Sequence, residues 1–166
     1  MSSGLHSEKY LQCALILQYP DIAEKFAKAL AGEFAKEKID VVAGPALGGI
    51  TLAYEVARQL GVRGIFTERQ DNKMVLRRGF GIKKDEKVLV LEDVVTTGLS
   101  TNEAIDVINE QGGIVVGVCS IIDRSSGAAK FAMPFKPLAK IDIKTYEEKA
   151  CPLCKKGIPV TKPGSR

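Results

Sequence analysis

The feature that most constrains the fold of this chain is the alternation of short apolar runs with amphipathic helical patterns. Strand-like runs occupy residues 39–43, 64–67, 88–91 and 114–122, and helical patterns occupy residues 21–35, 50–60 and 101–110. The runs Val88–Leu91 and Ile114–Val118 are apolar on both faces, which is typical of parallel strands covered by helices on either side. The alternation therefore predicts an α/β fold with a central, mostly parallel sheet flanked by helices.

The first helical pattern opens at Asp21, a residue type that can cap a first helical turn. Two segments break the alternation: the charged stretch 68–80 and the proline-containing tail 151–166. We expect both to be loops, the first a hairpin or a mobile flap and the second a surface tail. A chain of 166 residues can close one sizeable core, so a single domain spanning residues 1–166 is expected.

Charge and hydropathy exclude several classes of protein. The chain has 24 Lys and Arg against 20 Asp and Glu, a mild excess that suits phosphorylated metabolites and does not indicate a nucleic-acid partner. No apolar run approaches the ~20 residues needed to cross a bilayer, and residues 1–6 do not resemble a secretion signal. We therefore predict a cytoplasmic protein with no membrane partner.

The four cysteines fall into two groups. Cys13 and Cys119 lie in apolar stretches, where a reduced thiol packs as a small hydrophobic group. Cys151 and Cys154 have the spacing of half a zinc site, but a structural zinc takes four ligands and His6, the one histidine, is far away in sequence. A tight turn is the favoured interpretation of this pair; a zinc ion bridging two subunits and a redox pair remain open.

The stretch after strand 88–91 carries the strongest chemical signal. Glu92 and Asp93 follow the strand, and a Thr-Thr-Gly-Leu-Ser loop at 96–100 leads into a helix. Ligands of parallel sheets bind beyond the carboxyl ends of the strands, where paired carboxylates can accept hydrogen bonds from sugar hydroxyls or bind magnesium indirectly. Hydroxyls, a glycine and free amides at a helix start can cradle a phosphate. A capped connection without ligand could show any one of these features, but their combination favours a site.

Other segments offer weaker signals. The glycine-rich turn 43–49 could approach a second anion or could be a plain strand–helix turn. The stretch 68–80 has four cations against two acids and fits either a solvated hairpin or an anion-binding loop. Arg124 follows strand 114–122 and could grip a carboxylate with two parallel hydrogen bonds, or could form a surface pair with Asp123. A Walker loop is absent, which argues against a nucleotide triphosphatase.

Residues 88–101 resemble the signature for phosphoribosyl pyrophosphate (PRPP) in type I phosphoribosyltransferases. The resemblance implies that Glu92 and Asp93 hold the ribose hydroxyls. It assigns the 5-phosphate to the loop that follows, made of Val94, Val95, Thr96, Thr97, Gly98, Leu99 and Ser100. The loop that contains Ala46, Leu47 and Gly48 corresponds to one that contacts pyrophosphate, although some orotate enzymes carry a lysine where Leu47 stands.

Three further pieces resemble the orotate branch of the family. The stretch 68–80 corresponds to a flexible basic loop that closes over the leaving pyrophosphate, often across a dimer interface, with Arg69 and Lys73 as the expected contacts; the branch's histidine beyond the second lysine is missing. Arg124 corresponds to the arginine that holds the orotate carboxylate, with Thr96 nearby. Residues 2–11 correspond to a motif that lines the base pocket, in a small hood made by the two termini. The matching positions are Ser3, Gly4 and Tyr10.

Together these matches imply a fold, a reaction and a set of partners. We expect a type I phosphoribosyltransferase-like fold and an enzyme of pyrimidine (UMP) biosynthesis that converts orotate and PRPP into orotidine 5-phosphate and pyrophosphate. Mg²⁺ would be held mainly by the substrate, and a homodimer would share its active sites. The alternatives are an enzyme for a purine base and a non-catalytic regulator that senses PRPP. Because Met1 lies almost on the base-pocket motif, we also expect that the family's leading helix is missing.

Overall fold

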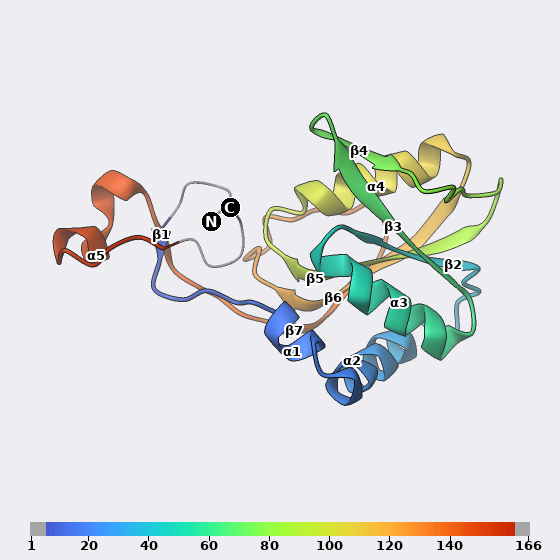
Figure 1. Cartoon of the computed structure of the whole chain (residues 1–166), viewed down its shortest axis with the longest axis horizontal. Helices are drawn as coiled ribbons and strands as arrows, with labels where there is room; N and C mark the ends of the chain where they lie inside the picture. Colours follow the sequence, from blue (N-terminus) through green and yellow to red (C-terminus); the bar gives the residue numbers. More distant parts are fainter. Residues whose placement is uncertain (1–5, 162–166) are drawn as a thin grey trace. The chain divides into compact units, whose positions relative to one another are not determined.

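The computed structural model describes residues 6–161, which divide into two compact units (Figure 1). The large unit spans residues Cys13–Ile141. The small unit combines both ends of the chain, Met1–Gln12 with Asp142–Arg166. A second unit made from the two termini agrees with the hood expected from sequence, whereas the prediction of a single domain remains a prediction.

A six-stranded sheet forms the centre of the large unit, with the strand order β4-β3-β2-β5-β6-β7. All neighbouring strands are parallel except the β3–β4 pair, so the mostly parallel sheet is confirmed. The strands are β2 (Val41–Pro45), β3 (Arg63–Gln70), β4 (Lys73–Leu76), β5 (Lys87–Val95), β6 (Ile114–Asp123) and β7 (Phe135–Lys140).

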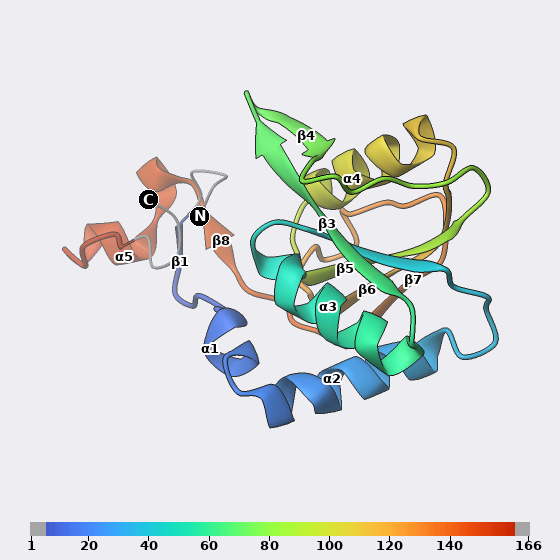
Figure 2. The same ribbon diagram turned by 45° about the vertical axis from the view of Figure 1, so that its right-hand side comes forward.

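Helices cover both faces of this sheet. They are α1 (Ala14–Leu17), α2 (Pro20–Glu33), α3 (Gly48–Leu60) and α4 (Leu99–Glu110). Figure 2 shows α4 on one side of the sheet and α2 and α3 on the other, in agreement with the contacts between these elements. Among the described residues, no helix combines the length and the apolar character needed to cross a bilayer.

The double-sided cover explains the uninterrupted apolar run of β5. Val88 and Val90 belong to the core that also contains Ile105 and Ile108 of α4. Because side chains alternate along a strand, Leu89 and Leu91 face the opposite layer, and they too are fully buried. On β6, Gly117 leaves room for the aromatic ring that ends α2, since a Cβ there would lie 2.1 Å from Cε1 of Phe34.

Cys13 and Cys119 are buried with 2% and 0% exposure, so their predicted place in the core is confirmed. The expected cap of α2 is wrong, however. The N-cap is Tyr19, and Pro20 takes the first helical position. Proline suits that position because its missing N–H would have no partner there. Asp21 lies in the first turn, where its charge still complements the helix dipole.

Two other expectations need correction. Stretch 68–80 is not a plain loop, because β3 runs to Gln70 and pairs with β4 around a turn at Asp71 and Asn72, both at positive φ. The hairpin alternative was therefore the correct one. The tail does not form a loop throughout, since α5 (Pro152–Lys155) is a short helix and Cys151 is buried.

The small unit contains little regular structure. Strands β1 (His6–Ser7) and β8 (Thr145–Tyr146) pair antiparallel through two residue pairs. A 3₁₀ turn, η1 (Glu148–Ala150), and α5 follow.

Candidate active site

The predicted site residues of the large unit gather where neighbouring strands end. The strands β3, β2, β5 and β6 lie side by side and run in the same direction, so their carboxyl ends share one edge of the sheet. The hairpin, the glycine-rich turn, the acid pair with its loop, and Arg124 belong to these four ends. The topology thus brings together segments spread over nearly 80 positions of the sequence.

The acid pair and the glycine-rich turn are in direct contact. A Cβ at Gly48 would lie 2.5 Å from Oδ1 of Asp93, so either the carboxylate or the turn would have to shift to admit a side chain. Leu47, next to it, is 85% exposed, and the peptide bond between Ala46 and Leu47 is cis. The backbone amide of Ala46 donates to the carbonyl of Thr67 at 2.7 Å, which ties the turn to the end of β3.

Glu92 and Asp93 lie inside β5, not after it, because the pairing of β5 with β6 continues to Val95. The amide of Val94 donates to Oδ1 of Asp93 at 2.8 Å, and the amide of Asp93 donates to Oε1 of Glu92 at 3.2 Å. Burial and then the neighbouring Asp93 carboxylate raise the pKa of Glu92 well above its usual range. Hydroxyl donors or a cation beside the pair would offset the burial and the repulsion that oppose ionisation of Glu92.

The loop after β5 has the geometry of an anion cradle. Gly98 is the N-cap of α4 with φ 78°, and the amide of Leu99 donates to Oγ1 of Thr97 at 3.3 Å. Thr96 and Thr97 are exposed, so their hydroxyls are open to a ligand. A twelve-residue helix behind the loop directs its positive dipole end and its first amides toward this point.

The cations of the hairpin differ in what they contact. Two guanidinium N–H groups of Arg69 donate to both carboxylate oxygens of Glu103 on α4, one of them at 3.2 Å. Arg78 is paired in the same two-pronged way with Glu68, at 3.0 Å for each bond. Lys73 is exposed and takes part in no ion pair within residues 6–161. Of the two predicted pyrophosphate contacts, Lys73 is accessible and Arg69 is held by α4.

Glu103 contacts a predicted site residue, and sequence analysis did not single it out. It lies 34 positions from Arg69, inside a helix whose sequence gives no reason to single it out. Only the placement of α4 beside the hairpin reveals the contact.

Arg124 lies immediately beyond β6 and beside the end of β5. Its amide donates to the carbonyl of Val95 at 2.8 Å, which places it next to Thr96 at the start of the cradle loop. Asp123 is 7% exposed, and its Oδ1 accepts a hydrogen bond from the amide of Ser125 at 2.8 Å. The buried Asp123 thus shapes the turn after β6 and is not a surface residue.

The small unit holds the other predicted residues. Ser3 and Gly4 lie outside the described residues. Tyr10 is 43% exposed and lines a cavity of about 320 Å³ within this unit. The same cavity is lined by His6, Cys151 and Cys154, whose ligand atoms all lie within 4.8 Å of one another. The sequence separation that argued against a histidine ligand is therefore no obstacle in the folded chain.

Comparisons with known proteins identify the family of this chain. A model of the phosphoribosyl transferase domain matches residues 15–150. The orotate phosphoribosyltransferase of Caldanaerobacter subterraneus subsp. tengcongensis is 60% identical over 166 residues, which cover all of this chain and 87% of that protein. That of Thermotoga maritima is 49% identical over 166 residues, which cover all of this chain and 89% of that protein.

Solved structures show the same fold at lower identity. The adenine phosphoribosyltransferase of Thermoanaerobacter pseudethanolicus superposes with a TM-score of 0.69 at 15% identity, over 84% of this chain and 97% of that one. The orotate phosphoribosyltransferase of Mycobacterium tuberculosis, in complex with 5-phospho-alpha-D-ribosyl 1-diphosphate, superposes with a TM-score of 0.66 at 24% identity. That match covers 79% of this chain and 80% of the other.

Proposed function

This chain belongs to the phosphoribosyltransferase family, and we propose that it transfers phosphoribose from PRPP to orotate, forming orotidine 5-phosphate and pyrophosphate. The observation that carries this proposal is the 60% identity, over the whole chain, to a protein named as an orotate phosphoribosyltransferase. The structure adds a physical basis, since an acid pair, an anion cradle and an arginine adjoin at one sheet edge.

In this reaction the acid pair and the cradle loop would hold the sugar phosphate. Glu92 and Asp93 accept hydrogen bonds from the ribose hydroxyls, and the loop 94–100 with the first amides of α4 binds the 5-phosphate. Positive charge develops on the ribose in the transition state, and the neighbouring carboxylates stabilise it electrostatically. No covalent nucleophile is needed.

The leaving pyrophosphate would meet the turn 46–48 and the hairpin. Backbone amides of the turn and the exposed ammonium group of Lys73 offset its growing charge. Arg69 adds a second cation once it exchanges Glu103 for the pyrophosphate. Closure of the hairpin would also exclude water and suppress hydrolysis of PRPP.

Magnesium fits the donor chemistry of the acid pair. Two adjacent carboxylates at the sheet edge are oxygen donors of the kind this ion takes, and their mutual proximity favours a nearby cation. Glu92 and Asp93 would hold it through water or through the ribose hydroxyls, so that most of its ligands come from PRPP. When bound, the ion would neutralise charge on the pyrophosphate.

The base specificity of the proposal rests on Arg124. Its position beside Thr96 and the end of β5 suits a planar guanidinium that grips the orotate carboxylate with two parallel hydrogen bonds. Purine bases lack this carboxylate, so an enzyme for them would not need the contact.

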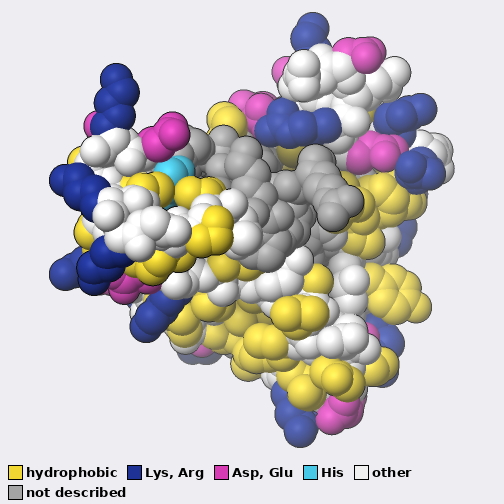
Figure 3. Space-filling model, turned by 60° about the vertical axis from the view of Figure 1, so that its left-hand side comes forward, with side chains coloured by type: hydrophobic (Ala, Val, Ile, Leu, Met, Phe, Trp, Pro, Cys, Tyr) yellow, Lys and Arg dark blue, Asp and Glu magenta, His cyan; other side chains and the backbone are white. Residues whose placement is uncertain are grey.

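We also propose that the active form is a homodimer. Exposed apolar side chains lie on α1, on the turn that follows it and on α3, and α1 contacts α3. They are Leu15 at 65%, Ile16 at 40%, Tyr19 at 53% and Tyr54 at 68% exposure. In the view of Figure 3, hydrophobic side chains gather on the lower part of the molecule, where α1 and α2 lie. An apolar patch of this kind suits a second copy of the chain.

The proposed reaction is tested by mixing the protein with PRPP and Mg²⁺ and adding either orotate or adenine. We expect pyrophosphate release and loss of free base with orotate alone. Release with adenine but not orotate would assign the chain to purine bases. Tight PRPP binding without turnover of either base would indicate a regulator.

Changing Arg124 to Ala tests the base contact itself. An unpaired carboxylate in a partly desolvated site should cost about 2–5 kcal/mol, or roughly thirty-fold to several thousand-fold in kcat/KM for orotate. PRPP binding, measured by calorimetry, should change little. Arg124→Lys should recover part of the loss, because a point charge cannot replace the guanidinium fork. An alanine variant with nearly full orotate use would show that Arg124 does not contact the base.

A further inference from the structure

The small unit has almost no apolar core. Its sheet consists of two residue pairs between β1 and β8, and α5 has four residues. Among its described residues, Cys151 alone is buried, with 1% exposure. Neither a two-stranded ribbon nor a single helical turn is stable by itself in water. Units this small commonly depend on a disulfide or a structural metal ion, so the buried cysteine indicates a cross-link of this kind.

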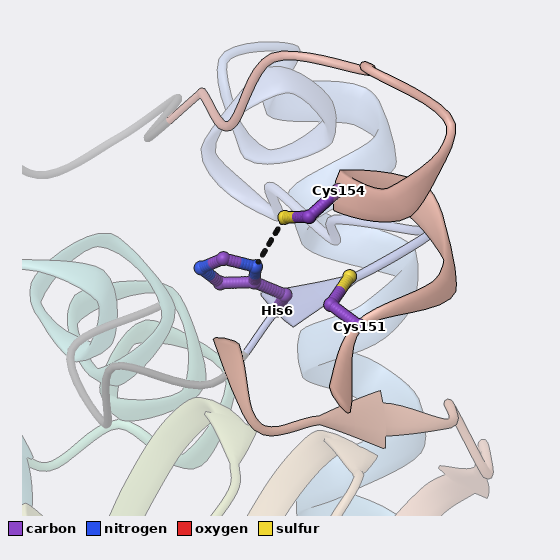
Figure 4. A group of neighbouring side chains, drawn as sticks. All are labelled: His6, Cys151 and Cys154. Carbon is purple, nitrogen blue, oxygen red and sulfur yellow. Dashed lines mark hydrogen bonds between the residues drawn. The ribbon is translucent and has the colours of Figure 1, made fainter. Parts of the chain in front are cut away.

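Three ligand-bearing side chains converge around this cysteine. Figure 4 shows His6 from β1, Cys151 just before α5 and Cys154 within α5 turned toward one another. Nδ1 of His6 lies 3.2 Å from Sγ of Cys154, and all three ligand atoms lie within 4.8 Å of one another. His6 and Cys154 are 148 positions apart in sequence, so folding of this unit creates the cluster.

The spacing suits a tetrahedral zinc ion. Zinc bonds of about 2.3 Å to sulfur and about 2.0–2.1 Å to nitrogen place neighbouring ligand atoms about 3.5–3.8 Å apart. In the cluster the distance between Nδ1 of His6 and Sγ of Cys154 is 3.2 Å, and no two of the three ligand atoms are more than 4.8 Å apart. Shifts of about 1 Å or less would therefore bring the three atoms to the spacing that zinc requires. Two thiolates with one imidazole favour zinc over magnesium or calcium, which prefer oxygen ligands.

We propose that the small unit binds one zinc ion through His6 Nδ1, Cys151 Sγ and Cys154 Sγ, with a water molecule as the fourth ligand. The cavity of about 320 Å³ beside the cluster gives water access to that position. The ion links β1 to the segment that follows β8 and so stabilises a unit that lacks an apolar core. This inference concerns the small unit alone and does not depend on the proposed transferase reaction.

The first test is metal analysis of the whole protein. We expect about one zinc per chain after expression with added zinc, purification without chelator and desalting. Replacement of zinc by cobalt should give thiolate-to-metal charge transfer and the intense visible absorption of tetrahedral Co²⁺. Removal of zinc with a chelator should speed hydrogen exchange in residues 6–7 and 145–154, with little change in the sheet of the large unit.

Variants separate the proposed ligands from other thiols. His6→Ala and Cys154→Ser should each weaken zinc affinity at least about a hundred-fold in competition with a chromogenic chelator. Cys13→Ala removes a buried thiol of the large unit and should keep one zinc per chain.

Several outcomes would overturn the proposal. They are uptake below about one tenth of a zinc per chain after reduction and reconstitution, or unchanged affinity in both ligand variants. One zinc per two chains would mean that a second subunit supplies the remaining ligands. A Cys151–Cys154 disulfide in protein that takes up no zinc after reduction would make the pair a redox couple.

Discussion

The acid pair carries a conflict between stability and function at the level of a single residue. Glu92 is placed where burial and the Asp93 carboxylate oppose its ionised form and raise its pKa. Such a group destabilises the folded chain once it loses its proton. The same negative charge is what a ribose hydroxyl or a magnesium ion requires, so the site retains it.

Glu92→Gln should therefore increase stability while reducing activity. Because the folded pKa of Glu92 is above its unfolded value of about 4.3, the folded state holds a proton that the unfolded chain has lost. Its contribution to the free energy of unfolding falls as pH rises from about 4.3 through the folded pKa and is flat above it. Glutamine removes this fall. At about pH 8 the free energy of unfolding of the variant should therefore be about 1 kcal/mol larger than that of the wild type, which corresponds to a melting temperature about 3 °C higher.

Urea denaturation of both proteins at about pH 4 and about pH 8 measures the effect. The gain should appear at the higher pH and shrink at the lower one, and kcat should fall at least about ten-fold. Glu110→Gln, at an exposed position at the end of α4, provides the control and should change neither quantity. Equal stability differences at both pH values would contradict the assignment of the pKa shift.

Gly48 sets the position of Asp93 and has a prediction of its own. In Gly48→Ala the new methyl group would lie 2.5 Å from Oδ1 of Asp93, so the carboxylate or the turn must move. A displacement of about 1 Å in a catalytic group can lower kcat/KM for PRPP about a hundred-fold.

Gly32→Ala is the matched control for this variant. Gly32 lies in α2, and a Cβ there meets nothing within 4 Å. It should keep full activity and gain about 0.5–1 kcal/mol from helix propensity. Steady-state kinetics with PRPP varied, together with thermal melts, compare the two variants. Full activity in Gly48→Ala would show that the turn and the acid pair do not act as one site.

At the scale of elements, the hairpin is held in its observed position by the Arg69–Glu103 pair. Arg69 must leave Glu103 before it can contact pyrophosphate. An exposed pair of this kind stabilises by about 0.2–1 kcal/mol. Glu103→Gln should therefore tighten PRPP binding about two- to five-fold and speed hydrogen exchange at the tip of the hairpin.

Glu68→Gln is the matched control, because it weakens the Arg78 pair of the same hairpin and leaves Arg69 untouched. Calorimetry with PRPP at low and high salt would measure both variants, and the difference between them should shrink as salt screens the ion pair. Weaker PRPP binding in Glu103→Gln would mean that Glu103 positions Arg69 for the ligand.

Strands that are buried on both faces could be predicted from sequence, and the exposed edge strand β7 could not. β5 and β6 are continuous apolar runs because helices cover both sides. β7 was missed because it is an edge strand with Pro137 and two lysines, residues that a central strand would not tolerate.

The candidate site divides in the same way. The acid pair and the cradle loop are contiguous in sequence and could be identified from it. The Arg69–Glu103 and His6–Cys154 contacts join residues 34 and 148 positions apart, and a single sequence carries no distance information of that kind.

At the scale of the whole molecule, the position of Lys73 has a consequence for the proposed dimer. Its exposed side chain lies on an edge strand of the sheet, where a neighbouring subunit can approach it. We expect the hairpin of one subunit to close over the site of its partner. Lys73→Ala and Asp93→Asn then inactivate different parts of the same composite site.

Mixing these two inactive variants should restore activity. With random exchange, half of the dimers are mixed, and one of the two sites in each mixed dimer combines an intact acid pair with an intact hairpin. Recovery should therefore reach about a quarter of wild-type activity, as two-fold symmetry requires. Differently tagged chains confirm that mixed dimers form, and each variant incubated alone supplies the baseline. If confirmed mixed dimers stay inactive, each hairpin serves its own subunit. If Tyr54→Asp, which places a charge in the apolar patch, leaves the subunits associated, the dimer uses another face.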